Sequence, residues 1–270
     1  MQVRNRIVGL VRFSYPALTG FVRQDGDPDA NVAALHARDR LEARFALFER
    51  FALPSLLAQS DGRFETLFLV GEGFPRWAMD RLSDLTAPLR GARIVALPPM
   101  QHYPATQAAF GMLPDDGCTH LTGFRLDDDD AMDIHHIARL RRMAEGMLRA
   151  VDAAKPFCIG HNRGLFLDLS QPRGPVWRTV VEKLPIGIGL AMCAPVERRE
   201  NIFRRNHRLL SMYYTVLTDA DHIAFVRTIH DGNDSEAKAS GQSAEMAPLD
   251  LGPVLRQGFP FLTPPPETAG

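Results

Sequence analysis

The sequence has 270 residues, a formal net charge of −1 and 45% hydrophobic residues. This length suits one large globular domain or two small ones, and the near-zero charge indicates neither a nucleic-acid groove nor a basic membrane face. No apolar run approaches the roughly 20 residues of a membrane-spanning helix. The three cysteines form no CxxC pair and are expected to be buried thiols (Cys118, Cys158 and Cys193). We therefore expect a soluble, cytoplasmic protein.

The first half of the chain alternates short apolar runs with helical patterns. The predicted strands are residues 5–13, 64–71, 92–97 and 119–126, and the predicted helices are 31–50, 75–85 and 103–112. Such alternation predicts an α/β fold in which helices cover both faces of a sheet. Ligands of these sheets bind outside the carboxyl ends of the strands.

The second half has a different pattern. Further strands are predicted at residues 157–160, 165–169, 176–181, 188–193 and 223–229, and further helices at 133–154 and 198–213. After residue 235 the chain is rich in Ala, Gly, Ser, Glu and Pro, so a weakly ordered tail is expected over 236–270.

Four consecutive carboxylates, Asp127 to Asp130, stand between the strand at 119–126 and the helix that follows. Acids packed this closely repel one another and would hold protons unless something positive lies beside them. A divalent metal is the obvious candidate, since hard cations take carboxylate oxygens. If the backbone stays extended, Asp127 and Asp129 point to one side, with Asp128 and Asp130 on the other.

Other interpretations of the run were considered. Asp130 or Asp133 could cap the next helix, which leaves the other acids unexplained. An EF-hand fails, because a loop starting at Asp127 puts Met132 at its glycine position and Ala138 at its closing glutamate position. A phosphohydrolase with Asp127 as nucleophile, and a non-enzymatic acidic module that binds cations or a partner protein, stay open as alternatives.

A nucleotide-sugar-binding DxD element fits the context better. Sugar transfer makes a nucleoside diphosphate the leaving group, and a metal held by carboxylates can neutralise the charge that develops on it. A second nearby acid can accept hydrogen bonds from the ribose.

Several segments resemble a bacterial family of rhamnosyltransferases, and the acidic run looks like the DxD segment of GT-A glycosyltransferases. The segments are VGLVRFSY at residues 8–15, FERF at 48–51, LPSL at 53–56 with Gln59, FLVGE at 68–72, and RTIH at 227–230 with Asn233, Asp234 and Ser235. The resemblance implies a GT-A-like (nucleotide-diphospho-sugar transferase) fold with a mixed, mostly parallel central sheet flanked by helices. It implies a single catalytic domain over 1–235, in which 1–130 bind the nucleotide and 131–235 form the acceptor side.

The resemblance also implies roles for individual residues. The donor would be bound by Arg12, Phe13, Ser14, Arg125, Asp127 and Asp128, although Phe13 also fits a core position. A Mn or Mg ion would be held by Asp129, Asp130 and His230, and His230 and Asp231 are the catalytic candidates.

The sequence thus predicts a metal-dependent transfer of a sugar, with rhamnose as one candidate, from a nucleoside-diphosphate donor to a hydroxyl of a saccharide or lipid-linked acceptor. An inverting enzyme needs a general base for that hydroxyl. The candidates are Glu182, Glu197, Glu200, Asp219 and Asp221, and the sequence does not choose among them.

Overall fold

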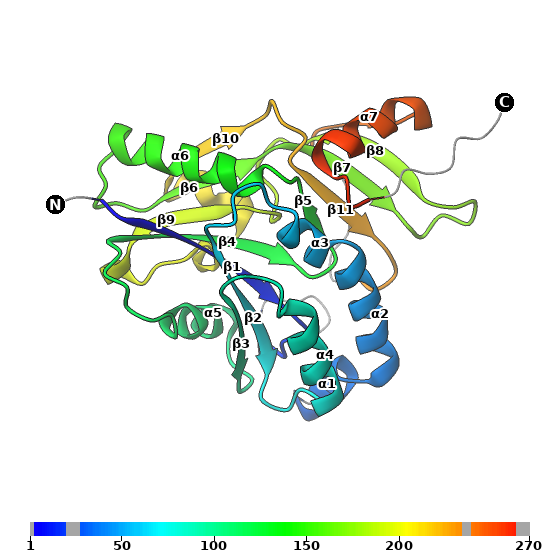
Figure 1. Cartoon of the computed structure of the whole chain (residues 1–270), viewed down its shortest axis with the longest axis horizontal. Coiled ribbons are helices and arrows are strands. Elements are labelled where there is room, and N and C mark those ends of the chain that lie inside the picture. The colour runs from blue at the N-terminus through cyan, green and yellow to red at the C-terminus, as the bar shows by residue number, and fades with distance from the viewer. Residues whose placement is uncertain (1–2, 20–27, 234–238, 263–270) are drawn as a thin grey trace.

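The computed structural model of the chain describes residues 3–19, 28–233 and 239–262 (Figure 1). Its centre is a seven-stranded sheet. The strands, in spatial order, are β10 (Thr215–Asp219), β6 (Phe157–His161), β9 (Ala191–Pro195), β4 (His120–Asp127), β1 (Asn5–Arg12), β2 (Glu65–Gly71) and β3 (Ala92–Leu97). Four of the six pairings are parallel, so the predicted α/β class with a mixed, mostly parallel sheet is confirmed.

The register of β1 and β4 fixes where the site lies. The two strands run parallel, and Arg12 at the end of β1 is paired with Asp127 at the end of β4. Strand β1 has β2 on one side and β4 on the other, so the chain continues from β1 toward both edges of the sheet. A crevice forms at such a switch point beyond the carboxyl ends of the strands, so the acidic run begins where a ligand is expected.

Helices cover both faces of this sheet (Figure 1). One face packs against α2 (Arg38–Arg50), α3 (Ala52–Leu57), α4 (Arg76–Thr86) and α6 (His136–Ala150), and the other packs against α5 (His102–Gly111) and two 3₁₀ segments. Strand β1 shows the cause: Val11 is buried toward the first face, whereas Val8 and Leu10 are buried toward the second. Because side chains alternate along a strand, a nearly continuous apolar run supplies both cores.

A second, five-stranded sheet carries the late part of the chain. Its spatial order is β12 (Gln242–Glu245), β8 (Val176–Val181), β7 (Arg163–Asp168), β11 (Phe225–Ile229) and β5 (Ala131–Met132). The two-residue strand β5 follows the acids immediately and pairs with β11. This pairing brings the end of β11, and therefore His230, beside the acidic run.

Two of the predicted helices are wrong. The helix expected over 31–50 is divided into α1 (Pro28–Leu35) and α2, with Ala37 in extended backbone between them. Residues 198–213 form three 3₁₀ segments, η1 (Val196–Arg198), η2 (Ile202–Arg204) and η3 (His207–Met212), instead of one helix. The side chains of Asn201 and Asn206 accept backbone N–H groups two residues ahead, and each asparagine thereby caps the start of a new 3₁₀ segment.

The expectation of a weakly ordered tail is wrong for residues 239–262. Strand β12 extends the second sheet, and α7 (Pro248–Gly258) buries Leu251 and Leu255, followed by Phe259, against that sheet. Pro248 begins this helix, at a position where proline is common, whereas Pro253 lies inside it. The remaining tail residues lie outside the described part of the chain. Within the described part, no helix is long and apolar enough to cross a membrane.

Candidate functional site

A cavity of about 1650 Å³ lies at the carboxyl ends of β1 and β4. Its walls come from both halves of the chain: the acidic run, the amino-terminal part of α2, the segment 182–188, the segment 203–208 and the turn after β11. The cavity is rich in cationic side chains, which are Arg12, Arg40, Arg44, Arg125, Lys183, Arg204, Arg205, Arg208 and Arg227. The four carboxylates thus lie in a cavity whose other charged side chains are mostly positive, and such a cavity suits a ligand with several negative charges.

The acids do not continue the strand. Asp127 ends β4, and the Asp130 N–H donates to the Asp127 carbonyl at 3.3 Å, which closes a tight turn. The expected alternation of side chains is therefore wrong, because it assumed an extended backbone. The turn instead gives each carboxylate a different set of partners.

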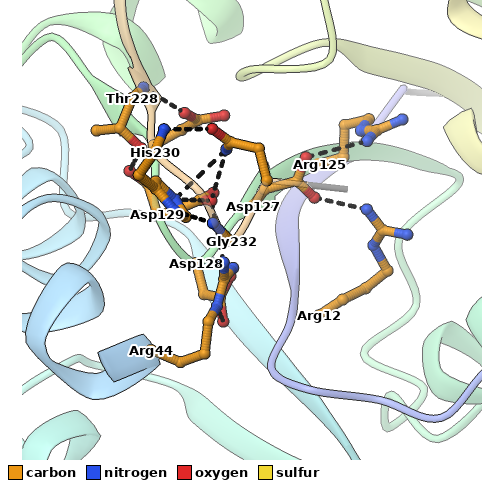
Figure 2. Close-up of polar contacts among 11 residues, drawn as sticks. Arg12, Arg44, Arg125, Asp127, Asp128, Asp129, Thr228, His230 and Gly232 are labelled. Carbon is orange, nitrogen blue, oxygen red and sulfur yellow. Dashed lines mark hydrogen bonds and ion pairs between the residues drawn. The ribbon is translucent and has the colours of Figure 1, made fainter. Parts of the chain in front are cut away.

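Asp127 is held by two arginines. Arg12 donates to one carboxylate oxygen at 2.7 Å and Arg125 to the other at 3.3 Å (Figure 2). Burial alone would raise the pKa of Asp127, but the two guanidiniums outweigh it and hold that pKa well below its usual value. With a side chain 32% exposed, Asp127 is the most accessible of the four acids and is ionised.

Asp128 and Asp129 share a single arginine from α2. Arg44 forms an ion pair with Asp128 and donates to Asp129 at 3.1 Å. Both acids are almost completely buried. Charges removed from water in this way need a partner, and Arg44 supplies it for both acids.

His230 reaches Asp129 from the end of β11. Its Nε2 lies 3.0 Å from the Asp129 carboxylate, and the backbone N–H of Gly232 donates to its Nδ1 (Figure 2). The second bond leaves the proton on Nε2, which therefore donates to Asp129. Asn233 accepts the His230 N–H through its side-chain oxygen at 2.6 Å and fixes the turn. Burial alone would raise the pKa of Asp129, but the hydrogen bond from His230 and the charge of Arg44 outweigh it, so this pKa lies below its usual value.

Asp130 has a different environment. It accepts the backbone N–H of Thr228 at 3.0 Å, while the Thr228 hydroxyl donates to the Asp129 carbonyl. Burial, together with the charges of Asp129 and Asp127, raises the pKa of Asp130 well above its usual value. A carboxyl group in this position favours its neutral form unless a cation comes beside it.

The structure brings nearly all predicted site residues to one place. The predicted site residues that line the cavity are Arg12, Ser14, Arg125, Asp127, Asp128, Asp129, Asp130, His230 and Asp231. Phe13 is the exception: it is fully buried against Phe45 and Phe48. Assigning Phe13 to donor binding is therefore a mistake, because the β1 side chains alternate and Phe13 points into the core between the sheet and α2.

Of the five candidate bases, Glu182 alone lines the cavity. Glu200 is paired with Arg198 and Arg204, and Asp219 with Arg139 and His222. Glu197 lies in η1 and Asp221 follows β10, neither at the cavity. Glu182 accepts the N–H of Ser240 at 2.8 Å, so this carboxylate is held by the segment that leads into β12.

Sequence reasoning missed several cavity residues. Arg44 gave no signal, because an arginine on the polar side of a predicted helix is ordinarily solvated. Phe203 lies under two site arginines, with the guanidinium carbons of Arg12 and Arg125 at 5.9 and 5.3 Å from its ring centre. His102 lies 3.2 Å from Arg12, and burial together with Arg12 and Arg125 lowers the pKa of His102 to about 3.

The chemistry of the site residues suits a metal ion, but these residues do not form a complete metal site by themselves. Carboxylate oxygens are suitable donors for Mn or Mg, and the hydrogen bond that the buried Asp130 accepts comes from the backbone N–H of Thr228. Both ring nitrogens of His230 are engaged, with Asp129 and with the Gly232 N–H. Over residues 3–19, 28–233 and 239–262, no group of three or more His, Cys, Asp or Glu side chains is arranged to hold a metal. A metal here would need further ligands from a bound molecule or water.

The acidic turn lies at the carboxyl end of a central strand in a mixed α/β sheet, which is where ligands of such sheets bind. A family model described as "Putative rhamnosyl transferase" matches residues 6–242. The chain belongs to this family.

Solved structures resemble the chain only distantly. A fragment of S. aureus TarS in complex with UDP has a TM-score of 0.44 and 8% identity, over 83% of this chain and 60% of that fragment. A protein from Desulfovibrio desulfuricans described as a "putative nucleotide-diphospho-sugar transferase" has a TM-score of 0.38 and 9% identity, over 85% of this chain and 83% of that one. The chain thus spans about 60% of the TarS fragment. None of the curated proteins matches it.

Proposed function

We propose that the protein is a metal-dependent glycosyltransferase that moves a sugar from a nucleoside-diphosphate donor to a hydroxyl of a saccharide or lipid-linked acceptor. The observation that supports this most is the convergence of Asp127, Asp129 and His230 on one cavity lined with arginines. Rhamnose as the transferred sugar follows from the family, whose name supplies it.

The donor would bind with its diphosphate toward the arginines. Arg12 and Arg125 come from neighbouring strands and already converge on Asp127. In this proposal Asp127 orients the two guanidiniums and accepts a hydrogen bond from the nucleotide, most plainly from a ribose hydroxyl. Ser14, whose backbone is left-handed with φ of 49°, presents the loop after β1 to the same cavity. Asp128 acts through Arg44 and positions the turn.

Asp129 and Asp130 are the residues proposed to hold Mn or Mg. His230, which the resemblance implied as a third ligand, is proposed to orient Asp129 instead, because its Nε2 donates to that carboxylate and its Nδ1 accepts the Gly232 N–H. The bound ion would neutralise the charge that develops on the diphosphate leaving group. The protein's own part is to keep these donors at one point: Arg44 and His230 orient Asp129, and the Thr228 N–H orients Asp130. Arginines around the cavity stabilise the departing diphosphate by the same electrostatic principle.

The alternatives are less well supported. A phosphohydrolase needs Asp127 as a nucleophile, but both of its carboxylate oxygens accept from arginines. An acidic surface module needs the acids on a convex surface, whereas they line a cavity and three of them are buried.

Calorimetric titration with UDP, GDP and dTDP, with and without Mn²⁺, tests the proposal. We expect one of these nucleotides to bind in a manner that depends on Mn²⁺, and Asp129→Asn to weaken that binding about 10- to 100-fold. Asp84→Asn, on the exposed side of α4, is the matched control and should bind like the parent. Metal-independent binding that is unchanged in Asp129→Asn would remove the metal role, and absence of binding by all three nucleotides would remove the donor class.

A further inference from the structure

Residues 196–213 carry an unusual share of the exposed apolar side chains. Nine large hydrophobic residues in the described part of the chain are exposed, and four of them lie within these 18 residues: Val196, Leu209, Met212 and Tyr213. Leu209 is 45% exposed, Met212 71% and Tyr213 50%. Single exposed hydrophobics need no explanation, but Leu209, Met212 and Tyr213 lie within five consecutive residues, and a contiguous exposed apolar patch marks an interaction site.

The geometry of η3 places two of these side chains together. In a 3₁₀ helix residues three apart lie on the same edge, so Leu209 and Met212 share one edge and His207 and Leu210 share another. Leu210 is buried in the core under the sheet, and His207 lines the large cavity. The helix thus faces the cavity and core on one side and directs Leu209 and Met212 outward.

The same segment is basic. It contains Arg198, Arg199, Arg204, Arg205 and Arg208 against only Glu197 and Glu200, a formal charge of +3 in a chain whose total is −1. The guanidinium of Arg205 lies 4.3 Å from the ring centre of Tyr213, so charge and exposed aromatic surface are in direct contact. The overall composition concealed this local basic surface.

Basic side chains beside outward-facing Leu, Met and Tyr form the combination that binds the interface of an anionic bilayer. We propose that residues 196–213 dock on an anionic phospholipid surface, with Leu209, Met212 and Tyr213 entering the headgroup region and the arginines contacting lipid phosphates. Long arginine side chains can reach the headgroups while their stems cover apolar surface.

This contact would place the cavity at the membrane surface. Phe203, Arg204 and Arg208 line the cavity and belong to the same segment as the exposed residues. A lipid-linked acceptor could then offer its hydroxyl without leaving the bilayer. That use of the contact rests on the proposed function, whereas the docking itself does not.

Vesicle flotation of the full chain, without nucleotide, tests the docking. The probes are vesicles of phosphatidylcholine alone and of phosphatidylcholine with 30 mol% phosphatidylglycerol. We expect binding to the anionic vesicles only, weakened about tenfold or more between low and high salt because the arginine contacts are screened. The Leu209→Ser, Met212→Ser double variant should need at least about tenfold more lipid for half-binding.

The chain offers a matched control. Leu57 and Met112 are also an exposed leucine and methionine, outside this segment, and Leu57→Ser with Met112→Ser should leave vesicle binding unchanged. Unfolding midpoints of both double variants show whether the folds are intact. Equal binding to neutral vesicles, no binding, or equal loss in the two double variants would overturn the proposal. A concentration-dependent dimer that Leu209→Ser and Met212→Ser abolish would also overturn it, because a second copy would then cover the surface. Nucleotide titration is read separately, so failure of the proposed function is distinguishable from failure of docking.

Discussion

Two networks of arginines and carboxylates lie within a few residues of each other but in different surroundings. The first is the acidic turn of residues 127–130, with its three arginines around the cavity. The second is centred on Asp133, which pairs with Arg139 of α6. Arg139 also reaches His161 at 3.1 Å and Asp219 at 3.4 Å.

The difference lies in access. Asp133 and Arg139 are almost completely buried and neither lines the large cavity. Asp133 and Asp219 both pair with Arg139, so the contacts of the second network are made among its own side chains, and we expect them to act on the stability of the fold. The first network faces a cavity whose lining carries further arginines, and it contains a carboxyl group, Asp130, that favours protonation. Similar chemistry thus serves structure in one place and is available to a ligand in the other.

Arg139→Met should have the largest effect on stability. It leaves the Asp133 carboxylate buried without its cation, which costs about 3–5 kcal/mol of unfolding free energy. Urea denaturation measures this loss. Arg142→Met, on the exposed side of the same helix, should change the stability by less than about 0.5 kcal/mol. Equal losses in the two variants would contradict the structural role of the second network.

The second network should also make stability depend on pH. Burial and the nearby Arg139 lower the pKa of His136 to about 4, although Asp133 opposes them. Between pH 6.5 and about 4 the unfolded chain binds a proton at this position that the folded chain does not, so stability falls as the pH falls. The loss is at most about 1.4 kcal/mol per pH unit for this one group.

His136→Gln should flatten the dependence of the urea midpoint on pH across that window. The slope does not vanish, because other buried histidines such as His161 and His207 have lowered pKa values as well. His135→Gln, at the exposed neighbouring position, should keep the parent slope. Identical slopes in both variants would show that His136 is not the group that titrates.

Arg44→Met probes the first network with a smaller expected loss. The side chain of Arg44 lines the cavity, so water and Asp127's arginines can partly compensate for its removal, and a cost of about 1–3 kcal/mol is expected. Because a dication can replace the lost positive charge beside Asp128 and Asp129, Mn²⁺ should raise the melting temperature of the variant more than that of the parent. Arg38→Met, on the exposed part of α2, is the control. A Mn²⁺ effect equal to that on the parent would contradict this account.

The two networks also show what could be predicted from sequence. The strands of the first half were predictable because they are buried on both faces and form continuous apolar runs, and the position of the acids followed from the end of one such run. His230 was found because it leaves a clear strand. Arg44, Phe203 and the whole Asp133 network were not, because their partners lie far away in sequence and only the tertiary fold brings them together.

Most strands predicted in the second half are present, but the helix predicted over 198–213 is wrong and some short strands were not predicted, both for local reasons. Asn201 and Asn206 break an apparently helical pattern through side-chain bonds to the backbone, and short strands such as β5 and β10 have too few residues to show a period. Strand β12 is exposed along its length, so it has no apolar alternation at all.

Asp130→Asn should give the smallest change in unfolding free energy. Unlike Arg139→Met in the second network, it should stabilise the fold at high pH. Burial and the charges of Asp129 and Asp127 raise the pKa of Asp130, so in metal-free buffer the folded chain keeps a proton that the unfolded chain has released. Stability therefore falls as the pH rises above the unfolded value near 4. Asparagine still accepts the Thr228 N–H but carries no charge, so the variant should gain on the order of 1 kcal/mol over the parent at pH 8 and little at pH 4.

Asp127→Asn provides the opposite case on the same turn. Although burial opposes it, Arg12 and Arg125 lower the pKa of Asp127, so its ionised form stabilises the fold above pH 4 and its removal should cost stability at pH 8. Urea midpoints in EDTA at pH 4 and pH 8 measure both variants. A loss in both at pH 8 would mean that Asp130 is ionised and paired like its neighbours, and that the acidic turn, like the Asp133 network, is already complete without a ligand.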